Sequence, residues 1–471
     1  MWFLEDGLQG ALELRKKVLE GPVIKTLLWL AWPVIVANLV NMSYNLIDAL
    51  WLGRLGKEAF GAPTISWPLI TLLYSIGMGY MMAGIALISQ YFGAGEKHMA
   101  EKSAGYLFGF SLILATLMSI TGYVAAPSLL AAINTPEDIY PLALSYIRII
   151  FLGIPITFLG FIFNIVANAI GDTRTPTWLN IISAIINIIL DPILIFGLFG
   201  LPRLGVVGAA VATITSRSLV SFIGGYKLFK GFKGIKINPR YLIPEKWWLR
   251  KIFTIGTPLA VQRSSTSLGF TVMMSIVSRY GSVAVAAYGI SIRIIDIIQA
   301  FTLGINRATS IMIGQNIGAE KYERSREIAH KSIILIVTIL TIGALIIYLF
   351  SKQIITVFIN DPYVVSEGTS LLRIFTLSIP FFGIFFITSG IANGSGHTRA
   401  VAIISIIRLW VLRIGLSIVL AIILKMNTTG IWLAMSISNI VAGILSITWL
   451  SRGTWLKRVV EVPRIERLTE G

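Results

Sequence analysis

The sequence contains no cysteine and only three histidines among its 471 residues. Disulfides, thiolate metal sites and cysteine nucleophiles are therefore excluded. His98, His330 and His397 fall in or beside the connections between apolar segments, not in the middle of such a segment. A metal site built from histidines is not expected.

Charged residues are scarce as well. Only 13% of the residues are charged and 55% are hydrophobic, whereas soluble globular proteins contain about 25% charged residues. The apolar residues are gathered in runs such as 26–52, 333–350 and 431–450, and a helix of about 20 residues crosses the hydrocarbon core of a bilayer. We count twelve such runs, which predicts an all-α integral membrane protein with twelve transmembrane helices.

The N-terminal segment lacks the long uncharged stretch of a removable signal peptide, because Glu5, Asp6, Glu13 and Glu20 interrupt it. We expect residues 1–25 to be retained as a tail. Apolar residues beside a basic run would suit a short helix lying in the membrane interface, and a partly ordered tail is the alternative. The apolar residues in question are Trp2, Phe3, Leu4, Leu8, Leu12 and Leu14.

Basic residues outnumber acidic ones, and the formal net charge is +17. Many of them lie in the connection 227–251, and others lie in the two tails and near Lys97 and Lys321. When alternate loops are assigned to opposite sides, about 25 Lys and Arg fall on one side and about 6 on the other, which is the positive-inside pattern. This pattern predicts two cytoplasmic termini and explains the charge without a nucleic-acid partner.

An internal repeat divides the chain. Aligning the sequence with itself at one fixed offset places Pro33 on Pro258 and Gln90 on Gln315, and the matches continue without a gap through the fifth span of each half. Six spans per half make the two copies parallel, a construction typical of secondary transporters. The predicted organisation is a tail (1–25), an N-lobe (26–230), a basic cytoplasmic linker (231–251), a C-lobe (252–451) and a C-terminal cytoplasmic tail (452–471).

Two carboxylates, Asp48 and Asp191, lie inside apolar runs of the N-lobe. A charged group at mid-membrane costs about 2.5–3.5 kcal/mol, so each of them is a functional candidate. Each aspartate ends a stripe of polar residues on one helical face. The first stripe is Asn41, Tyr44, Asn45 and Asp48, the second is Asn180, Ser183, Asn187 and Asp191, and Asn164 and Thr213 complete the predicted cavity.

Two carboxylates in a partly dehydrated cavity repel one another, and a proton or a hard cation relieves that repulsion. The predicted site can therefore take up H⁺ or Na⁺, with Asp48, Asp191 and Asn187 as the expected sodium ligands. The residues leave the choice of ion open. The alternative is structural, because Asn, Ser and Thr also bond across membrane helices for modest energy.

The C-lobe does not repeat these carboxylates, since Met273 and Leu416 occupy the positions that correspond to Asp48 and Asp191. The two lobes are therefore expected to differ in function, with ion coupling in the N-lobe.

The C-lobe instead carries Arg263, Arg408 and Arg413 in apolar runs. These arginines either line a central cavity, contact anionic lipid or extend toward the interface. Arg293 and Asp296, close together on one predicted helix, are expected to pair on one helix face.

Several segments resemble the multidrug and toxic compound extrusion (MATE) family, and the resemblance covers nearly the whole chain. They are Pro33 with Tyr44, Asn45 and Asp48, the following 53–56, the 171–174 loop and the 208–213 run. Within the family the chain is similar to the prokaryotic DinF-type branch. The resemblance implies an antiporter that exports cationic or amphipathic small molecules against inward H⁺ or Na⁺ flow. It implies as site residues Asp48, Asp191, Asn187, Asn164, Tyr44, Asn45, Tyr146 and Thr213, with Pro33 as the kink of the first helix.

Other functions stay open on the sequence alone. A lipid-linked precursor flippase or an endogenous metabolite exporter fits the same plan, and a strongly cationic cavity through both lobes would favour an anionic lipid. An intramembrane aspartyl enzyme is disfavoured, because Asp48 lacks a glycine-containing motif and Pro192 follows Asp191. A receptor has less need of the duplication. We expect a monomer in the plasma membrane of a prokaryote, with small molecules and lipids as partners and no prosthetic cofactor.

Overall fold

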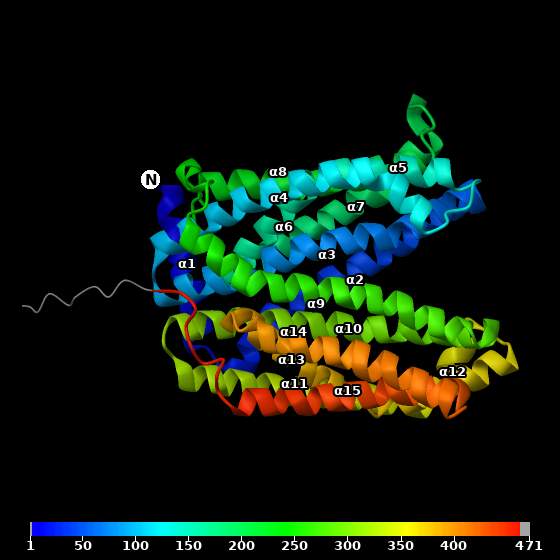
Figure 1. Ribbon diagram of the computed structural model, residues 1–471. Helices are drawn as coiled ribbons and strands as arrows, with labels where there is room; N and C mark the ends of the chain where they lie inside the picture. Colours follow the sequence, from blue (N-terminus) through cyan, green and yellow to red (C-terminus); the bar gives the residue numbers. More distant parts are fainter. Residues whose placement is uncertain (1, 462–471) are drawn as a thin grey trace, which may run out of the picture.

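A computed structural model describes residues 2–461, and the side chains of residues 2–8 and 46, which include the predicted interfacial Trp2, Phe3, Leu4 and Leu8, lie outside the description. Helices make up nearly all of the described chain (Figure 1). The first half contains α1 (Trp2–Glu20), α2 (Val23–Leu55), α3 (Lys57–Ala94), α4 (Lys97–Ala132), α5 (Tyr140–Leu152), α6 (Ile154–Ala169), α7 (Arg174–Phe196), η1 (Leu198–Gly200) and α8 (Val206–Lys230).

The second half follows a connection that contains η2 (Pro239–Tyr241). It begins at Lys246, inside the range predicted for the linker. Its helices are α9 (Lys246–Ser278), α10 (Gly281–Gly318), α11 (Tyr322–Phe358), α12 (Pro362–Thr376), α13 (Ile379–Ser395), α14 (Thr398–Ile406), η3 (Ile407–Gly415), η4 (Ile418–Ile423) and α15 (Asn427–Ser451).

Within residues 2–461, nine helical segments are long and apolar enough to cross a membrane, and two bent helix pairs qualify as further spans. The twelfth span is α9, whose hydropathy is lowered by the polar run 262–267. α9 packs along α3, so it lies within the bundle. The predicted twelve-helix membrane fold is confirmed.

The two bent spans occupy equivalent places in the repeat. α5 and α6 meet at 48°, and α12 and α13 meet at 55°. Pro155 and Pro380, which the repeat aligns with one another, stand in the first turn of the second helix of each pair. Proline lacks a backbone N–H and clashes with the preceding turn, so the helix stops and restarts there.

The eleventh span departs from α-helical geometry, because η3 and η4 are π-helical. In an α-helix, residues five apart point about 140° away from one another. The wider π-helical turn brings Arg408 and Arg413 toward the same neighbour. Both donate to Asn439 Oδ1, at 3.1 Å and 2.8 Å.

Figure 1 shows the two halves as separate groups of helices, with α1 and the last described residues at the same end of the molecule. At this end α3 and α10 cross at very short range. A Cβ atom on Gly93 would lie 2.0 Å from the carbonyl oxygen of Gln315, and one on Gly318 would lie 2.0 Å from that of Gln90. Only glycine allows this approach.

Beside the same crossing, two equivalent hydrogen bonds join the halves, one from α3 to α13 and one from α10 to α6. Gln90 Nε2 donates to the carbonyl oxygen of Gly394 at 3.1 Å, and Gln315 Nε2 donates to that of Ala169 at 2.8 Å. The repeat aligns the two donors with one another, and it aligns the two acceptors in the same way. We call this crossing, with Gly93 and Gly318, the terminal gate.

Arginines from outside the spans cap the two helix ends of the terminal gate. Arg15 of α1 donates to the carbonyl oxygen of Gly93 at 2.7 Å, and Arg458 of the C-terminal segment donates to that of Gly318 at 3.4 Å. The last carbonyls of a helix have no partner within it, so a basic side chain is a favourable cap.

Candidate functional site

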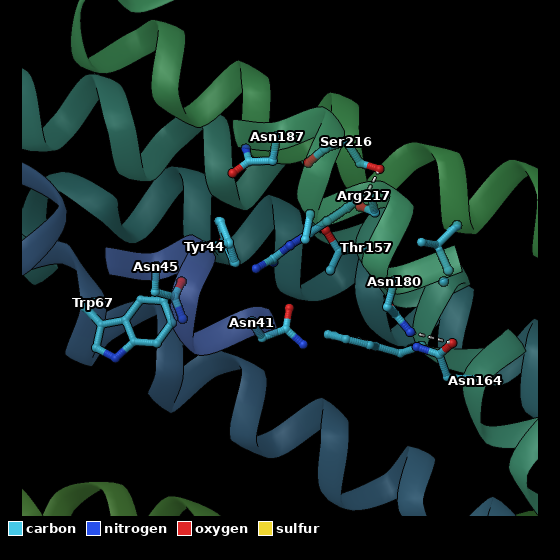
Figure 2. A pocket seen from close by; sticks show the side chains of 15 residues that line it. Asn41, Tyr44, Asn45, Trp67, Thr157, Asn164, Asn180, Asn187, Ser216 and Arg217 are labelled. Atoms are coloured by element: carbon cyan, nitrogen blue, oxygen red, sulfur yellow. Dashed lines mark hydrogen bonds between the residues drawn. The ribbon is translucent and has the colours of Figure 1, made fainter. Parts of the chain in front are cut away.

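The N-lobe contains a polar cavity of ≈ 220 Å³, enclosed by α2, α6, α7 and α8 with Trp67 from α3 (Figure 2). Six of the ten predicted site residues line it, namely Asn41, Tyr44, Asn45, Asn164, Asn180 and Asn187. The helical spacing explains why α2 and α7 each present several of them to one space.

Hydrogen bonds fix the stripe on α7 against its neighbours. Asn180 Nδ2 donates to Asn164 Oδ1 of α6 at 3.3 Å, a bond drawn in Figure 2. Ser183 Oγ donates to the carbonyl oxygen of Ser216 in α8 at 2.7 Å. These two contacts are the helix-to-helix bonds of the structural alternative, whereas Asn187 makes a different contact.

Asn187 connects the cavity to a buried carboxylate. Its Nδ2 donates to Asp191 Oδ1 at 3.3 Å, and the side chain of Asp191 is 0% exposed. Asp191 Oδ2, Asn187 Oδ1 and Asp48 Oδ1 are all buried and have no hydrogen-bond partner among the described residues. Asp48 and Asp191 themselves are not among the residues that line the cavity.

The remaining predicted residues also lie away from the cavity wall. Tyr146 and Thr213 are each 8% exposed, and neither lines the cavity. Pro33 lies inside α2, which runs across it without a break. Its role as a hinge stays a prediction.

Arg217 is the residue that the sequence analysis missed. It lines the N-lobe cavity, and Figure 2 shows its side chain reaching from α8 into the cavity in the direction of Tyr44. The signal was present in the sequence, because an arginine within an apolar span is a functional candidate by default. It also lies one helical turn after Thr213, on the same helical face. Among the described residues that line the N-lobe cavity, the charged one is therefore basic, and it adds to the polar residues that the sequence predicted there.

The C-lobe contains a larger cavity of ≈ 530 Å³, bounded by α3, α9, α10, α13 and the eleventh span. Arg263 and Arg408 line it, so these two predicted arginines face a cavity. Arg413 does not line it, and is 5% exposed with Nε donating to Ser438 Oγ at 3.1 Å. Trp67 lines both cavities, which places them side by side.

The expected ion pair between Arg293 and Asp296 is not formed. The two side chains make no salt bridge within the described chain, and Asp296 Oδ1 accepts a hydrogen bond from Gln299 at 3.5 Å. A spacing of three permits a pair on a helix, but side-chain rotamers decide whether it forms.

Two parallel six-helix halves with polar cavities inside the bundle define a membrane transport protein. The family model MatE matches residues 33–193 and 258–419, one segment in each half. Because the match covers more than half of the chain, this protein belongs to the MatE family of multidrug and toxic compound extrusion transporters. It is a transporter and not an enzyme.

The relatives agree with this assignment. The chain is 29% identical to "Probable multidrug resistance protein YoeA" of Bacillus subtilis over 91% of this chain and 93% of the relative. It is 25% identical to "FAD transporter" of Shewanella oneidensis over 91% of this chain and 95% of the relative. It matches a solved MATE "in the bent conformation" with TM-score 0.87 and 26% identity, over 95% and 98% of the two chains.

These comparisons confirm the predicted family and fold, and the chain is related to multidrug efflux transporters of bacterial membranes. The DinF-type branch, the coupling ion and the roles of the site residues stay predictions.

Proposed function

We propose that this protein is a secondary active antiporter that exports amphipathic small molecules in exchange for H⁺ or Na⁺ taken up at Asp48 and Asp191. The observation that carries the proposal is the set of three buried oxygen atoms without a hydrogen-bond partner, Asp48 Oδ1, Asn187 Oδ1 and Asp191 Oδ2. The family membership supports transport, and relatives named for drug resistance and for FAD support amphipathic cargo.

A buried polar atom without a partner costs free energy, and a buried carboxylate costs more. A proton on one carboxylate supplies a donor where none exists. A sodium ion instead accepts oxygen ligands, and carboxylate and amide oxygens are the ligands that a hard cation prefers. The donor set of Asp48, Asn187 and Asp191 is compatible with either ion.

Arg217 changes the charge balance of this proposal. When Arg217 is counted with the two aspartates in their ionised form, the three groups carry one net negative charge, which a single H⁺ or Na⁺ neutralises. Uptake of one cation per cycle is therefore the expected stoichiometry. α2, the first membrane span, lacks one backbone hydrogen bond at Pro33, and it can bend there as the site is neutralised.

Replacement of the aspartates tests the proposal. Asp48→Asn and Asp191→Asn should each reduce gradient-driven ion uptake into proteoliposomes at least about tenfold, a loss of about 1.4 kcal/mol or more in transition-state stabilisation. The readouts are uptake of radioactive sodium and the response of a trapped pH dye. They report ion movement whatever the charge of the exported molecule.

Asp296→Asn is the matched control, because Asp296 is also an aspartate within a span but lies in the C-lobe. It should keep most of the uptake, and all three variants should elute as folded, monodisperse protein. An inactive Asp296→Asn together with an active Asp191→Asn would reverse the assignment of the coupling site.

A further inference from the structure

The cavities are lined by charge of one sign. In the part of the chain that the structure describes, the charged residues lining the two cavities are Arg217 in the N-lobe and Arg263 and Arg408 in the C-lobe. We propose that the C-lobe cavity binds an amphipathic organic anion, with its phosphate or carboxylate group held by Arg263 and Arg408. This inference rests on the proposed function and deepens it by naming the charge of the exported molecule.

The two C-lobe arginines have donors to spare. Arg408 is 5% exposed, its Nη1 donates to Asn439 Oδ1 at 3.1 Å, and its Nε is buried without a partner among the described residues. Arg263 makes no hydrogen bond or salt bridge with any residue that the structure describes. A guanidinium group matches the geometry of carboxylate and phosphate, and binds them with paired hydrogen bonds.

A third arginine lies beside the same cavity. Arg307 of α10 has its Nη1 3.1 Å from the sulfur atom of Met82, and Met82 lines the C-lobe cavity. Methionine sulfur is a weak acceptor and does not neutralise the charge. A low-dielectric cavity lined by like charges concentrates the field and raises the local concentration of the opposite charge.

No carboxylate is placed to neutralise these arginines within the cavity wall. Among the described lining residues the acidic types are absent, and Asp296 contacts the wall through the neutral side chain of Gln299. Arg408 is 5% exposed, and a buried charge without a counterion is strongly unfavourable. The side chain of Arg263 is exposed and lines the same cavity, so it can reach a ligand directly. An anionic ligand therefore has a larger electrostatic gain here than a cationic one.

The rest of the wall suits the apolar part of such a ligand. Phe385 lies beneath Arg408, with the guanidinium carbon 4.9 Å from the ring centroid. Phe270, Leu303 and Phe386 also line the cavity. The volume of ≈ 530 Å³ is in the range of about 300–1,000 Å³ that is common for small-molecule sites.

The anion has two chemically similar sources, the headgroup region of a membrane lipid and a soluble organic phosphate. Two probes distinguish them. Dodecyl phosphate represents the lipid, and 1-naphthyl phosphate represents a soluble aromatic anion. Dodecyltrimethylammonium has the same chain length as dodecyl phosphate and the opposite charge.

The experiment is a calorimetric titration of the full-length protein in nanodiscs of neutral phosphatidylcholine, without any ion gradient. Wild type should bind dodecyl phosphate or 1-naphthyl phosphate at least about tenfold more tightly than dodecyltrimethylammonium. Arg263→Gln and Arg408→Gln should each weaken anion binding by about tenfold to hundredfold, the usual loss for a hydrogen bond to a charged group.

Two further variants keep the test decisive. Arg293→Gln is the matched control, because Arg293 lies in the same lobe but does not line the cavity. This variant should bind both anionic probes as tightly as wild type. Arg263→Lys retains the charge and should keep more of the affinity than Arg263→Gln. If Arg408→Gln does not fold, the more accessible Arg263 carries the test alone.

Equal affinity for the anionic and cationic probes, or an Arg263→Gln protein that binds both anions as tightly as wild type, overturns the inference. Because binding is measured without a gradient, the anion-binding test can fail while the proposed antiport stands, and the antiport can fail while anion binding stands. Anion binding without gradient-driven transport would remove the proposed antiport and leave the binding site. Ion-driven export of a cationic dye without anion binding would remove the proposed anion site and leave the antiport.

Discussion

At the scale of single residues, two kinds of charge lie inside the membrane-spanning bundle and occupy different places. Arg217, Arg263 and Arg408 line the cavities, whereas Asp48 and Asp191 do not. Substrate and coupling ion therefore need not compete for one charged group. In the proposed antiport, we therefore expect the ion to act on the substrate through movement of helices.

Glu245 is a charged residue outside the spans with a well-defined effect. Lys102 Nζ lies 2.8 Å from its Oε1, and Tyr106 and Trp247 donate hydrogen bonds to it. These contacts, with Lys102 first, lower the pKa of Glu245 from 4.5 to about 2. The ionised form is thus favoured by folding, and Glu245 ties the start of α9 to α4.

The folded-state pKa of Glu245 is below its unfolded value, so its stabilising contribution is complete above pH 4.5 and is lost as the pH falls toward about 2. Glu245→Gln should lower the melting temperature at neutral pH, and the difference from wild type should shrink below pH 4.5. Since the side chain of Glu245 is half exposed, we expect the substitution to lower the free energy of unfolding at neutral pH by about 0.5–1 kcal/mol.

Melting curves from neutral pH down to strongly acidic pH measure this effect, with Glu461→Gln as the control. Glu461 pairs with Lys251 but is 94% exposed, so its loss should have little effect at any pH. A deficit of Glu245→Gln that is the same at all pH values would mean that packing, not charge, was lost.

The place of six predicted residues in the cavity wall was predictable at the residue scale, because a spacing of three or four identifies a helical face and the cavity lies between such faces. Which members of a stripe reach the cavity was not predictable. Asp48 follows Tyr44 by one turn, yet only Tyr44 lines the wall.

At the scale of helices, the crossing of α3 and α10 depends on the absence of a side chain at two positions. The Cβ of Gly318→Ala would lie 2.0 Å from a backbone oxygen that cannot move independently of its helix. We expect the added methyl group to destabilise the closed crossing of α3 and α10 by about 1–3 kcal/mol, because it overpacks the contact. That shifts the ratio of two conformations by about 5- to 150-fold toward one in which the terminal gate is open.

Spin labels on Lys97→Cys and Glu323→Cys measure this shift, and the naturally cysteine-free chain needs no other change. Both positions are exposed and lie just beyond the two crossing helices. Gly318→Ala should populate longer label distances. Gly343→Ala on α11, where a Cβ would meet nothing within 4 Å, should not. Identical distance distributions in the two variants would contradict the role of Gly318.

The π-helical stretch that contains Arg408 and Arg413 was beyond sequence-based prediction. Its residues form an ordinary apolar run, and a spacing of five places the two arginines on different sides of an α-helix. Their shared acceptor, Asn439, belongs to the next helix in the chain. Only tertiary packing shows that the pair is brought together.

At the scale of the whole molecule, the twelve spans were predictable because apolar length is a strong signal in a bilayer. The parallel halves were predictable because a single offset aligns most of both. The family model agrees, since its two matches begin at Pro33 and Pro258, which that offset places on one another. The terminal gate was not predictable, since contacts between the halves leave no periodic trace in the sequence.

The orientation in the membrane is a further prediction, carried by the uneven loop charges. A membrane-impermeant maleimide should label Lys230→Cys only from the cytoplasmic side and Leu201→Cys only from outside. Both side chains are exposed, and they lie at opposite ends of α8. Labelling from the opposite sides would invert the topology, and labelling of both from one side would contradict a single crossing between them.

The caps of the terminal gate come from different parts of the chain in the two halves. The offset that places Gln90 on Gln315 places Arg15 on Arg240, but Arg240 is exposed in the connection between the halves. Gly318 is capped by Arg458 instead. The two symmetric helix ends are therefore closed from opposite ends of the chain, by α1 in the first half and by the tail after Ser451 in the second.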